Sequence, residues 1–281
     1  MPKHYEAMQR AEQERRRKVS GVDLSVPAAV SFEDAVVPPA RAKSPGLFSR
    51  FFSGSGNQAL KGANEANKRR IALLQPDSYV AEQYRSLRGR IDSLASQRPL
   101  KTLAVISANA GEGKSTCAVN LATVTAMSVG RSVLLIDCDL RRPKVHWTLG
   151  LQPQVGLAEV LLNQATLDEA IQKLDGINLD ILPVRTIPSN PSELLASPDM
   201  RRLIEEVAGR YDRVILDTPA CLGLPDAKSV SEFCDGLVMV VRAGVTPKEE
   251  VQAALDILDR RRVVGMVLNG SESTREQYGY Y

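Results

Sequence analysis

The sequence predicts an α/β fold in which helices cover both faces of a mostly parallel sheet. After residue 78, short apolar runs alternate with stretches of helical periodicity. Parallel pairing is favoured because each intervening helix carries the chain back across the sheet. Hydrophobic residues make up 43% of the 281 residues and charged residues 25%, which excludes a fibrous or wholly disordered chain. Strands are expected at 103–106, 133–136, 179–182, 214–216, 237–241 and 263–268.

The first 70 residues differ from the rest in charge and composition. They carry 13 Lys and Arg against 7 Asp and Glu, whereas residues 71–281 carry 23 against 26. Clusters of Pro, Gly and Ser predict a disordered basic leader. Two interpretations stay open: a solvated tail, or contact with an anionic surface or partner. The mildly acidic remainder argues against nucleic-acid binding.

The first predicted helix covers residues 78–96. Apolar residues recur at spacings of three and four, which indicates an amphipathic helix. Glu82, Arg85 and Arg88 follow one another at spacings of three and therefore lie along one side of it. Taken alone, these charges are typical of a solvated, salt-bridged surface.

A glycine-rich loop follows the strand at 103–106 and precedes a helix at 114–129. It ends in the letters GEGKST, residues 111–116. Backbone amides at such a junction bind phosphates, Lys114 reaches the β- and γ-phosphates, and the Ser115 hydroxyl binds Mg²⁺. Ala108 stands where the strict pattern has glycine. The motif predicts a P-loop NTPase-like fold that binds ATP.

Acidic residues end two further apolar strands. Asp137 and Asp139 follow the strand at 133–136, in the sequence LLIDCDLRRP, and Asp217 follows the strand at 214–216, in VILDTP. Ligands of open α/β sheets sit at the carboxyl ends of the strands, so these carboxylates are expected beside the phosphates. A carboxylate in this position holds Mg²⁺ directly or through water. Further helices are expected at 157–162, 167–173, 192–208, 226–233 and 247–260.

The three motifs together resemble those of the bacterial tyrosine kinases (BY-kinases), which use a P-loop fold. The family's DxDxR motif is matched by Asp137, Asp139 and Arg141. Two departures occur: Ala110 replaces the proline that usually precedes GEGKS, and Pro219 comes one residue early for a DxxP motif. The resemblance extends from about residue 71 to residue 281.

The resemblance implies roles for individual residues. Lys114, Asp137 and Asp139 would be catalytic, with Asp137 as the candidate base, and Ser115, Asp139 and Asp217 would place Mg²⁺. The loop would hold ATP, while Asn269 either contacts the adenine or forms a turn. The expected nucleotide-binding residues are Ala110, Gly111, Glu112, Gly113, Lys114, Ser115, Thr116 and Asn269.

The last four residues hold three of the seven tyrosines, Tyr278, Tyr280 and Tyr281. A fold has no need of aromatic residues at a terminus, where they are poorly buried. The resemblance implies that they are autophosphorylation sites. The chain is thus expected to comprise a leader (1–70), a kinase domain (71–269) and a flexible tail (270–281).

The resemblance also implies partners. Glu82, Arg85 and Arg88 match an ExxRxxR motif that joins subunits into a ring. A separate membrane chain-length regulator would activate the kinase, a tyrosine phosphatase would reverse it, and the process would control exopolysaccharide synthesis and export. No run of about 18 apolar residues occurs, and four cysteines form no CxxC pair, so a cytoplasmic protein recruited to the plasma membrane is expected.

Two alternatives remain at this stage. One is an ATPase switch of the partition or septum-placement type, which shares the fold but carries a lysine early in the P-loop, where this chain has Asn109. The other is a scaffold that binds ATP without catalysis.

Overall fold

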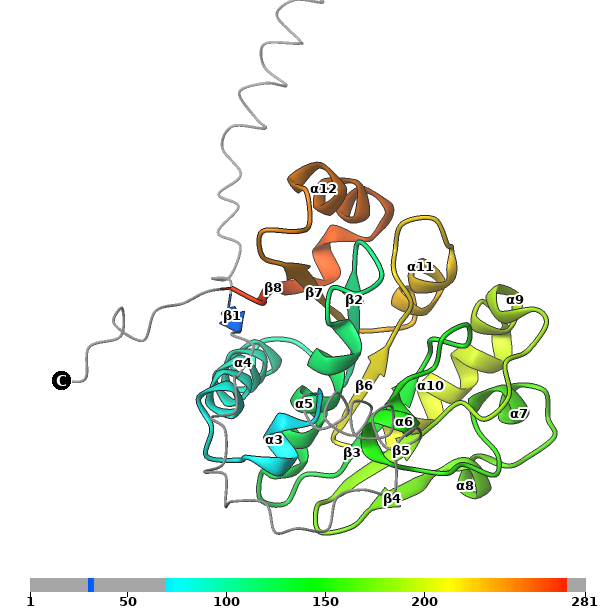
Figure 1. Cartoon of the computed structure of the whole chain (residues 1–281). Helices are drawn as coiled ribbons and strands as arrows, with labels where there is room; N and C mark the ends of the chain where they lie inside the picture. Colours follow the sequence, from blue (N-terminus) through cyan, green and yellow to red (C-terminus); the bar gives the residue numbers. More distant parts are fainter. Residues whose placement is uncertain (1–29, 33–68, 272–281) are drawn as a thin grey trace, which may run out of the picture.

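The computed structural model describes residues 30–32 and 69–271. Within them lies one eight-stranded sheet, in the order β1-β8-β7-β2-β6-β3-β5-β4 (Figure 1). All neighbouring strands run parallel except β4 and β5. The strands are β1 (Val30–Phe32), β2 (Thr102–Ser107), β3 (Val133–Asp137), β4 (Gln172–Leu174), β5 (Leu179–Leu182), β6 (Arg213–Asp217), β7 (Gly236–Arg242) and β8 (Val263–Asn269).

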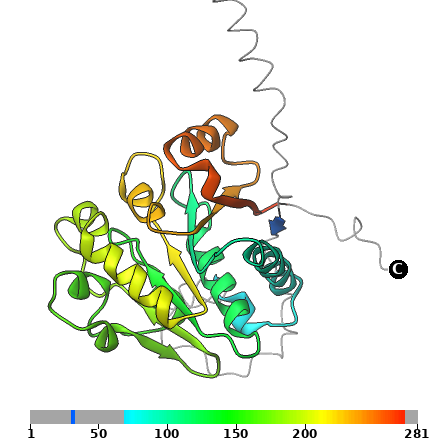
Figure 2. The same ribbon diagram turned by 180° about the vertical axis from the view of Figure 1, so that it is seen from behind.

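Two hydrophobic layers cover the sheet, and Figures 1 and 2 show them from opposite sides. Alternate residues of each strand point to opposite faces. Leu103 and Val105 of β2 pack with the first layer, and Ala104 and Ile106 with the second. The first layer contains α3 (Ile71–Leu74), α4 (Tyr79–Ala95), α5 (Lys114–Ala126) and α6 (Val145–Leu149). The second contains α7 (Leu157–Leu161), α8 (Leu167–Ala170), α9 (Pro191–Leu195), α10 (Pro198–Arg210), α11 (Asp226–Ser231) and α12 (Lys248–Ile257).

The expected α/β architecture is confirmed, and the expected strands and most helices lie within a few residues of their predicted bounds. The helix predicted over 78–96 is α4. The Ser78 hydroxyl caps it by accepting a hydrogen bond from the Ala81 amide at 3.2 Å. Apolar residues at the predicted spacings of three and four, Val80, Tyr84, Leu87 and Ile91, are buried.

Two predicted helices are wrong in part. The helix expected over 167–173 ends at Ala170, and Gln172–Leu174 forms the antiparallel edge strand β4. The reason is the turn at Asp175-Gly176, where a φ of 84° at Gly176 lets the chain reverse into β5. The helix expected over 192–208 is two helices, because Pro198 has no amide hydrogen to continue α9 and begins α10 instead.

Three further elements were not predicted, and one of them is the short helix α3, which precedes the first predicted helix. Helix α6 follows the acidic loop after β3, and the short strand β1 pairs in parallel with β8. Nothing in the leader's composition predicted β1. The rest of the leader and the tail from residue 272 onward lie outside the described residues. No helix of the described part combines the length and the apolarity needed to cross a membrane.

Candidate nucleotide site

The three predicted motifs meet at the carboxyl ends of three adjacent strands. β6 lies between β2, which leads into the glycine-rich loop, and β3, which leads into the acidic loop. The strand register pairs Asp217 with Val105 on one side and with Asp137 on the other. The fold therefore brings Lys114, Asp137, Asp139 and Asp217 into one site.

The glycine-rich loop turns sharply into α5. Gly111 and Gly113 have φ angles of 87° and 97°, a region that favours glycine. Gly113 is the N-cap of α5, so Lys114 is the first residue of the helix. A helix N-terminus directs free amides and a positive partial charge outward, as phosphate binding requires.

Lys114 is buried among carboxylates. Its Nζ atom lies 3.3 Å from Asp139 Oδ2, and only about a tenth of either side chain is exposed. Burial alone would lower the pKa of Lys114, but the nearby carboxylates of Asp217, Asp139 and Asp137 raise it above its ordinary value. The lysine therefore stays charged, and an incoming phosphate would compete with Asp139 for it.

Asp137 organises the loop that follows β3. The amide of Asp139 donates to its Oδ1 atom at 3.1 Å, and the amides of Lys144 and Val145 donate to Oδ2 at 3.1 and 3.0 Å. The carboxyl is fully buried, and burial, with the charge of Asp217 beside it, raises its pKa to about 8. Asp139 continues the pattern, since its Oδ1 atom accepts from the Arg142 amide at 3.0 Å.

Asp217 is buried in the same way but lacks such partners. Neither of its carboxylate oxygens has a hydrogen bond from the described residues. Burial raises its pKa to about 6, and the Lys114 ammonium and the Ser115 hydroxyl nearby limit the rise. Two buried, unpaired oxygens beside a phosphate-binding loop fit a Mg²⁺ ion.

The fit to Mg²⁺ involves the nucleotide as well as the protein. Among the described residues, no three Asp, Glu, His or Cys side chains form a complete metal site. Protein-bound Mg²⁺ is typically held by one or two carboxylates, with phosphate and water oxygens completing the octahedron. Ser115 and Asp217 are suitably placed for such a shared site, because they face one another at the start of α5 and the end of β6.

Sequence reasoning missed the partners of Arg141. Its Nε atom donates to Asp226 Oδ2 at 2.7 Å, and its Nη2 atom donates to Ser192 Oγ at 2.8 Å. The Ser192 hydroxyl in turn donates to Asp226 Oδ1 at 2.5 Å. The fully buried Asp226 begins α11, and Ser192 lies in α9, so three segments are fastened together beside the acidic loop. An isolated Asp and Ser gave no periodic signal that could reveal this.

Two of the predicted nucleotide-binding residues also contact one another and the protein around them. The Asn269 amide donates to the Glu112 carbonyl at 2.9 Å, and the Glu112 carboxylate accepts a hydrogen bond from Thr246 at 2.6 Å. A Cβ atom at Gly113 would lie 2.0 Å from the Asn269 side chain, so only glycine fits there. The Asn269 side chain thus lies against the nucleotide loop, and its contact with the adenine stays a prediction.

The charged side of α4 is partly turned toward the protein. Arg88 donates to the Val124 carbonyl at 2.8 Å and to Ser128 Oγ at 2.6 Å, which joins α4 to the end of α5. Arg85 donates to Glu82 at 2.5 Å and to the Pro76 carbonyl at 2.7 Å. Of the three predicted contact residues, Arg88 thus has a clear intramolecular role, while Glu82 and Arg85 are more exposed.

Three tyrosines lie within the described residues. Tyr84 and Tyr211 are buried, and the Tyr211 hydroxyl donates to Asp180 at 2.7 Å. Tyr79 is partly exposed on α4. The predicted phosphorylation sites Tyr278, Tyr280 and Tyr281 lie outside the described residues. All four cysteines are buried, as expected for apolar packing.

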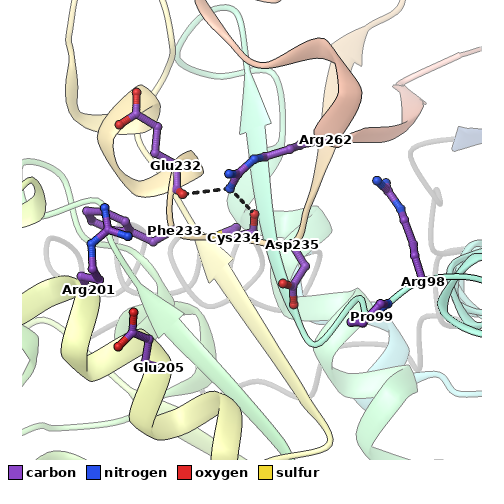
Figure 3. Close-up of a pocket in the computed structure, with 9 residues that line it drawn as sticks. All are labelled: Arg98, Pro99, Arg201, Glu205, Glu232, Phe233, Cys234, Asp235 and Arg262. Atoms are coloured by element: carbon purple, nitrogen blue, oxygen red, sulfur yellow. Dashed lines mark hydrogen bonds between the residues drawn. The ribbon is translucent and has the colours of Figure 1, made fainter.

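A cavity of about 550 Å³ lies at the end of the sheet opposite the nucleotide loop. Figure 3 shows the residues that line it. Asp235, in its wall, accepts hydrogen bonds from the Lys101 and Thr102 amides at the start of β2. Arg262 donates to the carbonyls of Glu232 and Cys234, and Arg201 stacks on the Phe233 ring. Since β2 is about 20 Å long, the cavity is remote from the nucleotide loop and holds none of the predicted site residues.

Comparison with known proteins agrees with this geometry. Residues 100–253 match the model of a family described as "AAA domain". The tyrosine-protein kinase YwqD of Bacillus subtilis is 42% identical over 214 residues, which cover 75% of this chain and 90% of that protein. ExoP of Rhizobium meliloti, a succinoglycan biosynthesis transport protein, is 33% identical; the match covers 75% of this chain but 29% of ExoP.

Solved structures show the same relationship. The kinase domain of the Escherichia coli tyrosine kinase ETK has a TM-score of 0.69 and 32% identity, covering 75% of this chain and 84% of that one. The chimerical protein CapA2B2 has the same score and identity, covering 73% and 91%. The septum site-determining protein MinD of Pyrococcus horikoshii, complexed with Mg-ADP, scores 0.52 at 25% identity, covering 62% and 72%.

The ETK kinase domain resembles this chain more closely than MinD does, by TM-score, by sequence identity and by the share of the chain that is covered. The match to the family model, over residues 100–253, includes the glycine-rich loop and the acidic strand ends. This chain belongs to the bacterial tyrosine kinase family and carries its P-loop nucleotide-binding domain.

Proposed function

We propose that this kinase is an ATP·Mg²⁺-dependent autokinase that phosphorylates Tyr278, Tyr280 and Tyr281 of its own tail. The observation that carries the proposal is the meeting of Lys114 with Asp139 and with the unpaired Asp217 carboxylate. Phosphoryl transfer depends mainly on positioning and charge stabilisation, and this site offers a lysine, helix amides and metal-binding oxygens together.

Each group has a role in the proposal. The amides of residues 110–116 hold the phosphates, Thr116 contacts the α-phosphate, and Lys114 neutralises the β- and γ-phosphates. Ser115, Asp139 and Asp217 hold Mg²⁺, directly or through water, and the metal spreads charge from the transferred group. Release of Lys114 from Asp139 would leave that carboxylate available to the metal.

Asp137 is the proposed proton acceptor for the tyrosine hydroxyl. A pKa near 8 suits a group that takes up a proton close to neutral pH. Its Oδ1 atom accepts one amide hydrogen bond and so keeps a second lone pair for the hydroxyl. The three hydrogen bonds from backbone amides hold the carboxylate in one orientation, which would position it for the tyrosine hydroxyl.

The tail is the proposed acceptor because it holds three closely spaced tyrosines, whereas two of the three described tyrosines are buried. Tyr84 and Tyr211 are buried, and a phosphate on either would need a large local opening. The tail follows Asn269, which is hydrogen-bonded to the nucleotide loop. Twelve residues extend at most about 40 Å, enough to reach a neighbouring subunit.

Transfer between subunits is our proposal, and it rests on the expected ring rather than on tail length. Because the tail begins beside its own nucleotide loop, length alone would also permit transfer within one chain. Glu82, exposed on α4, and the partly buried Arg85 are the proposed ring contacts, with Arg88 supporting the helix.

We further propose a link to exopolysaccharide synthesis and export. Similarity to ExoP, named for succinoglycan biosynthesis transport, supports it. A membrane chain-length regulator would recruit the kinase to the inner face of the plasma membrane and activate it, a tyrosine phosphatase would reverse the reaction, and no nucleic acid would take part. Similarity to the CapA2B2 chimera is compatible with a separate activator.

The rival is an ATPase switch without kinase activity. MinD supports it through the shared fold. Against it, the position of the early lysine is held by Asn109, whose side chain donates to Glu250 at 2.5 Å within the same chain. A non-catalytic scaffold is disfavoured by the complete set of lysine and carboxylates.

Incubation with labelled ATP followed by an anti-phosphotyrosine blot tests the proposal. The unaltered chain should label on tyrosine. Lys114→Met should neither bind ATP nor label, while changing Tyr278, Tyr280 and Tyr281 to Phe should preserve ATP binding and remove most label. ATP hydrolysis without phosphotyrosine would favour the switch, and major sites at Tyr79, Tyr84 or Tyr211 would contradict the tail assignment.

A further inference from the structure

The carboxylate of Glu112 lies within the nucleotide loop but is bound by protein groups. The Glu112 residue is only 3% exposed. Its Oε1 atom accepts a hydrogen bond from the Thr246 hydroxyl at 2.6 Å, and its Oε2 atom accepts one from the backbone amide of Asn109 at 3.1 Å. A buried carboxylate with short, charge-assisted hydrogen bonds is strongly held.

Thr246 belongs to the segment between β7 and α12, far from the loop in sequence. Its hydroxyl also accepts a hydrogen bond from the Arg242 amide at 3.1 Å, which fixes the turn that carries it. Arg242 adds a longer contact from its guanidinium to the Gly111 carbonyl at 3.4 Å. Two residues of the β7–α12 turn therefore hold two residues of the nucleotide loop.

The first half of the loop is bound to the same region. The Asn109 side chain donates to Glu250 in α12, and Ser107 Oγ donates to the Asn109 carbonyl at 2.7 Å. From the other side, Asn269 holds the Glu112 carbonyl. The loop is thus fastened at residues 109, 111 and 112 by the elements that follow β7 and end β8.

These contacts matter because the composition of the loop makes its backbone costly to order. Gly111 and Gly113 adopt positive φ angles, and glycine loses more conformational freedom than any other residue when it is ordered. Ala110 lacks the fixed φ that a proline would bring at that position. The amides that meet the phosphates need an external constraint to hold their direction.

We propose that Thr246, acting through the Glu112 carboxylate, is a positioning residue that sets the nucleotide loop of this kinase for phosphate binding. The hydroxyl–carboxylate bond fixes the Glu112 backbone, and thereby the amides on either side of Gly113. Thr246 touches neither Lys114 nor the strand-end carboxylates in the described contacts, so it acts on nucleotide affinity and not on the transfer step.

The test compares Thr246→Val, which keeps the shape and removes the hydroxyl, with Thr246→Ser, which restores it. Thr125→Val is the matched control, because the Thr125 hydroxyl also binds one acceptor, the Leu121 carbonyl at 2.6 Å, but at the far end of α5. Calorimetry gives the Kd of Mg-ADP, and phosphotyrosine formation gives KM for ATP and kcat. Thermal unfolding shows that each variant is folded.

We expect Thr246→Val to raise both Kd and KM about tenfold, with kcat within about threefold of the unaltered chain, as loss of a hydrogen bond to a charged group implies. Thr246→Ser and Thr125→Val should bind nucleotide normally. Glu112→Leu should weaken binding at least as much, because it removes the acceptor of the Thr246 hydrogen bond. The double variant should be little worse than Glu112→Leu alone, because each single change already removes that bond.

Other results would overturn the proposal. Normal nucleotide affinity in folded Thr246→Val would show that the bond does not set the loop. Fully additive effects of Thr246→Val and Glu112→Leu would show that the two residues act separately, for instance by direct contacts with nucleotide. A fall in kcat at unchanged KM would place Thr246 in the transfer step instead.

Discussion

Asp137 and Asp217 are register partners at the ends of adjacent parallel strands, yet their carboxylates have opposite surroundings. Three backbone amides bind Asp137, whereas both oxygens of Asp217 lack hydrogen bonds from the described residues. Two buried carboxylates side by side are costly unless each has compensating partners. The protein supplies those partners to Asp137, and Mg²⁺ with its nucleotide is the matching partner for Asp217.

Asp217→Asn should therefore weaken Mg²⁺ binding more than it lowers the stability of the fold. An amide has one acceptor oxygen and no charge, so the Mg²⁺ concentration for half-maximal labelling should rise about tenfold or more. A Mg²⁺ titration of phosphotyrosine formation at saturating ATP measures this. An unchanged Mg²⁺ requirement would remove Asp217 from the metal site.

Asp137→Asn should impair transfer more than nucleotide binding. The Asn amide group would face backbone amides that now donate to a carboxylate oxygen, so the loop over residues 139–145 should loosen as the proton acceptor is lost. We expect kcat to fall at least a hundredfold, with the Kd of Mg-ADP within a few-fold. Equal losses in Mg²⁺ affinity for Asp137→Asn and Asp139→Asn, with no effect on transfer, would contradict this division of roles.

Substitutions at Arg85 and Arg88 should differ in their effect on stability. Arg88→Ala removes two hydrogen bonds between α4 and α5 and should lower the free energy of unfolding by about 1–3 kcal/mol. Arg85→Glu should cost less than about 1 kcal/mol, since its partners are at the surface. Denaturant unfolding gives both values.

The Arg85→Glu variant also tests the ring, by light scattering. Arg85→Glu should yield a folded, ATP-binding monomer with little autophosphorylation. If it assembles and labels like the unaltered chain, the charged side of α4 is only solvated surface.

Mixing two inactive chains tests transfer between subunits. A Lys114→Met chain keeps its tail tyrosines, and a tail-Phe chain keeps its nucleotide site. Together they should restore labelling, on the Lys114→Met chain alone. Labelling of the unaltered chain should also rise faster than linearly with protein concentration. If the mixture shows no labelling, and labelling of the unaltered chain is first order in protein concentration, transfer occurs within one chain.

Sequence patterns predicted the sheet, the glycine-rich loop and the acidic strand ends, because each depends on local periodicity or on residues close in the chain. They could not predict how side chains far apart in sequence pair. Thr246 with Glu112, and Asp226 with Arg141, are 134 and 85 residues apart. Their pairing depends on strand order, which no local pattern specifies.

Boundary errors have a similar origin. The apolar spacing of residues 167–173 suits a helix, and only the pairing of Gln172–Leu174 with β5 makes the second half a strand. Arg88 has the spacing of a surface charge, but the end of α5 lies beneath it and offers two acceptors. Tertiary neighbours decided both cases.

The edge strand β4 limits how copies of this chain can associate. It has three residues, and the side chain at its middle, Lys173, is exposed and charged. A short, lysine-bearing margin is a poor template for a foreign strand. Growth of the sheet from one molecule into the next is therefore disfavoured at this edge, and the opposite edge, β1, is equally short at three residues.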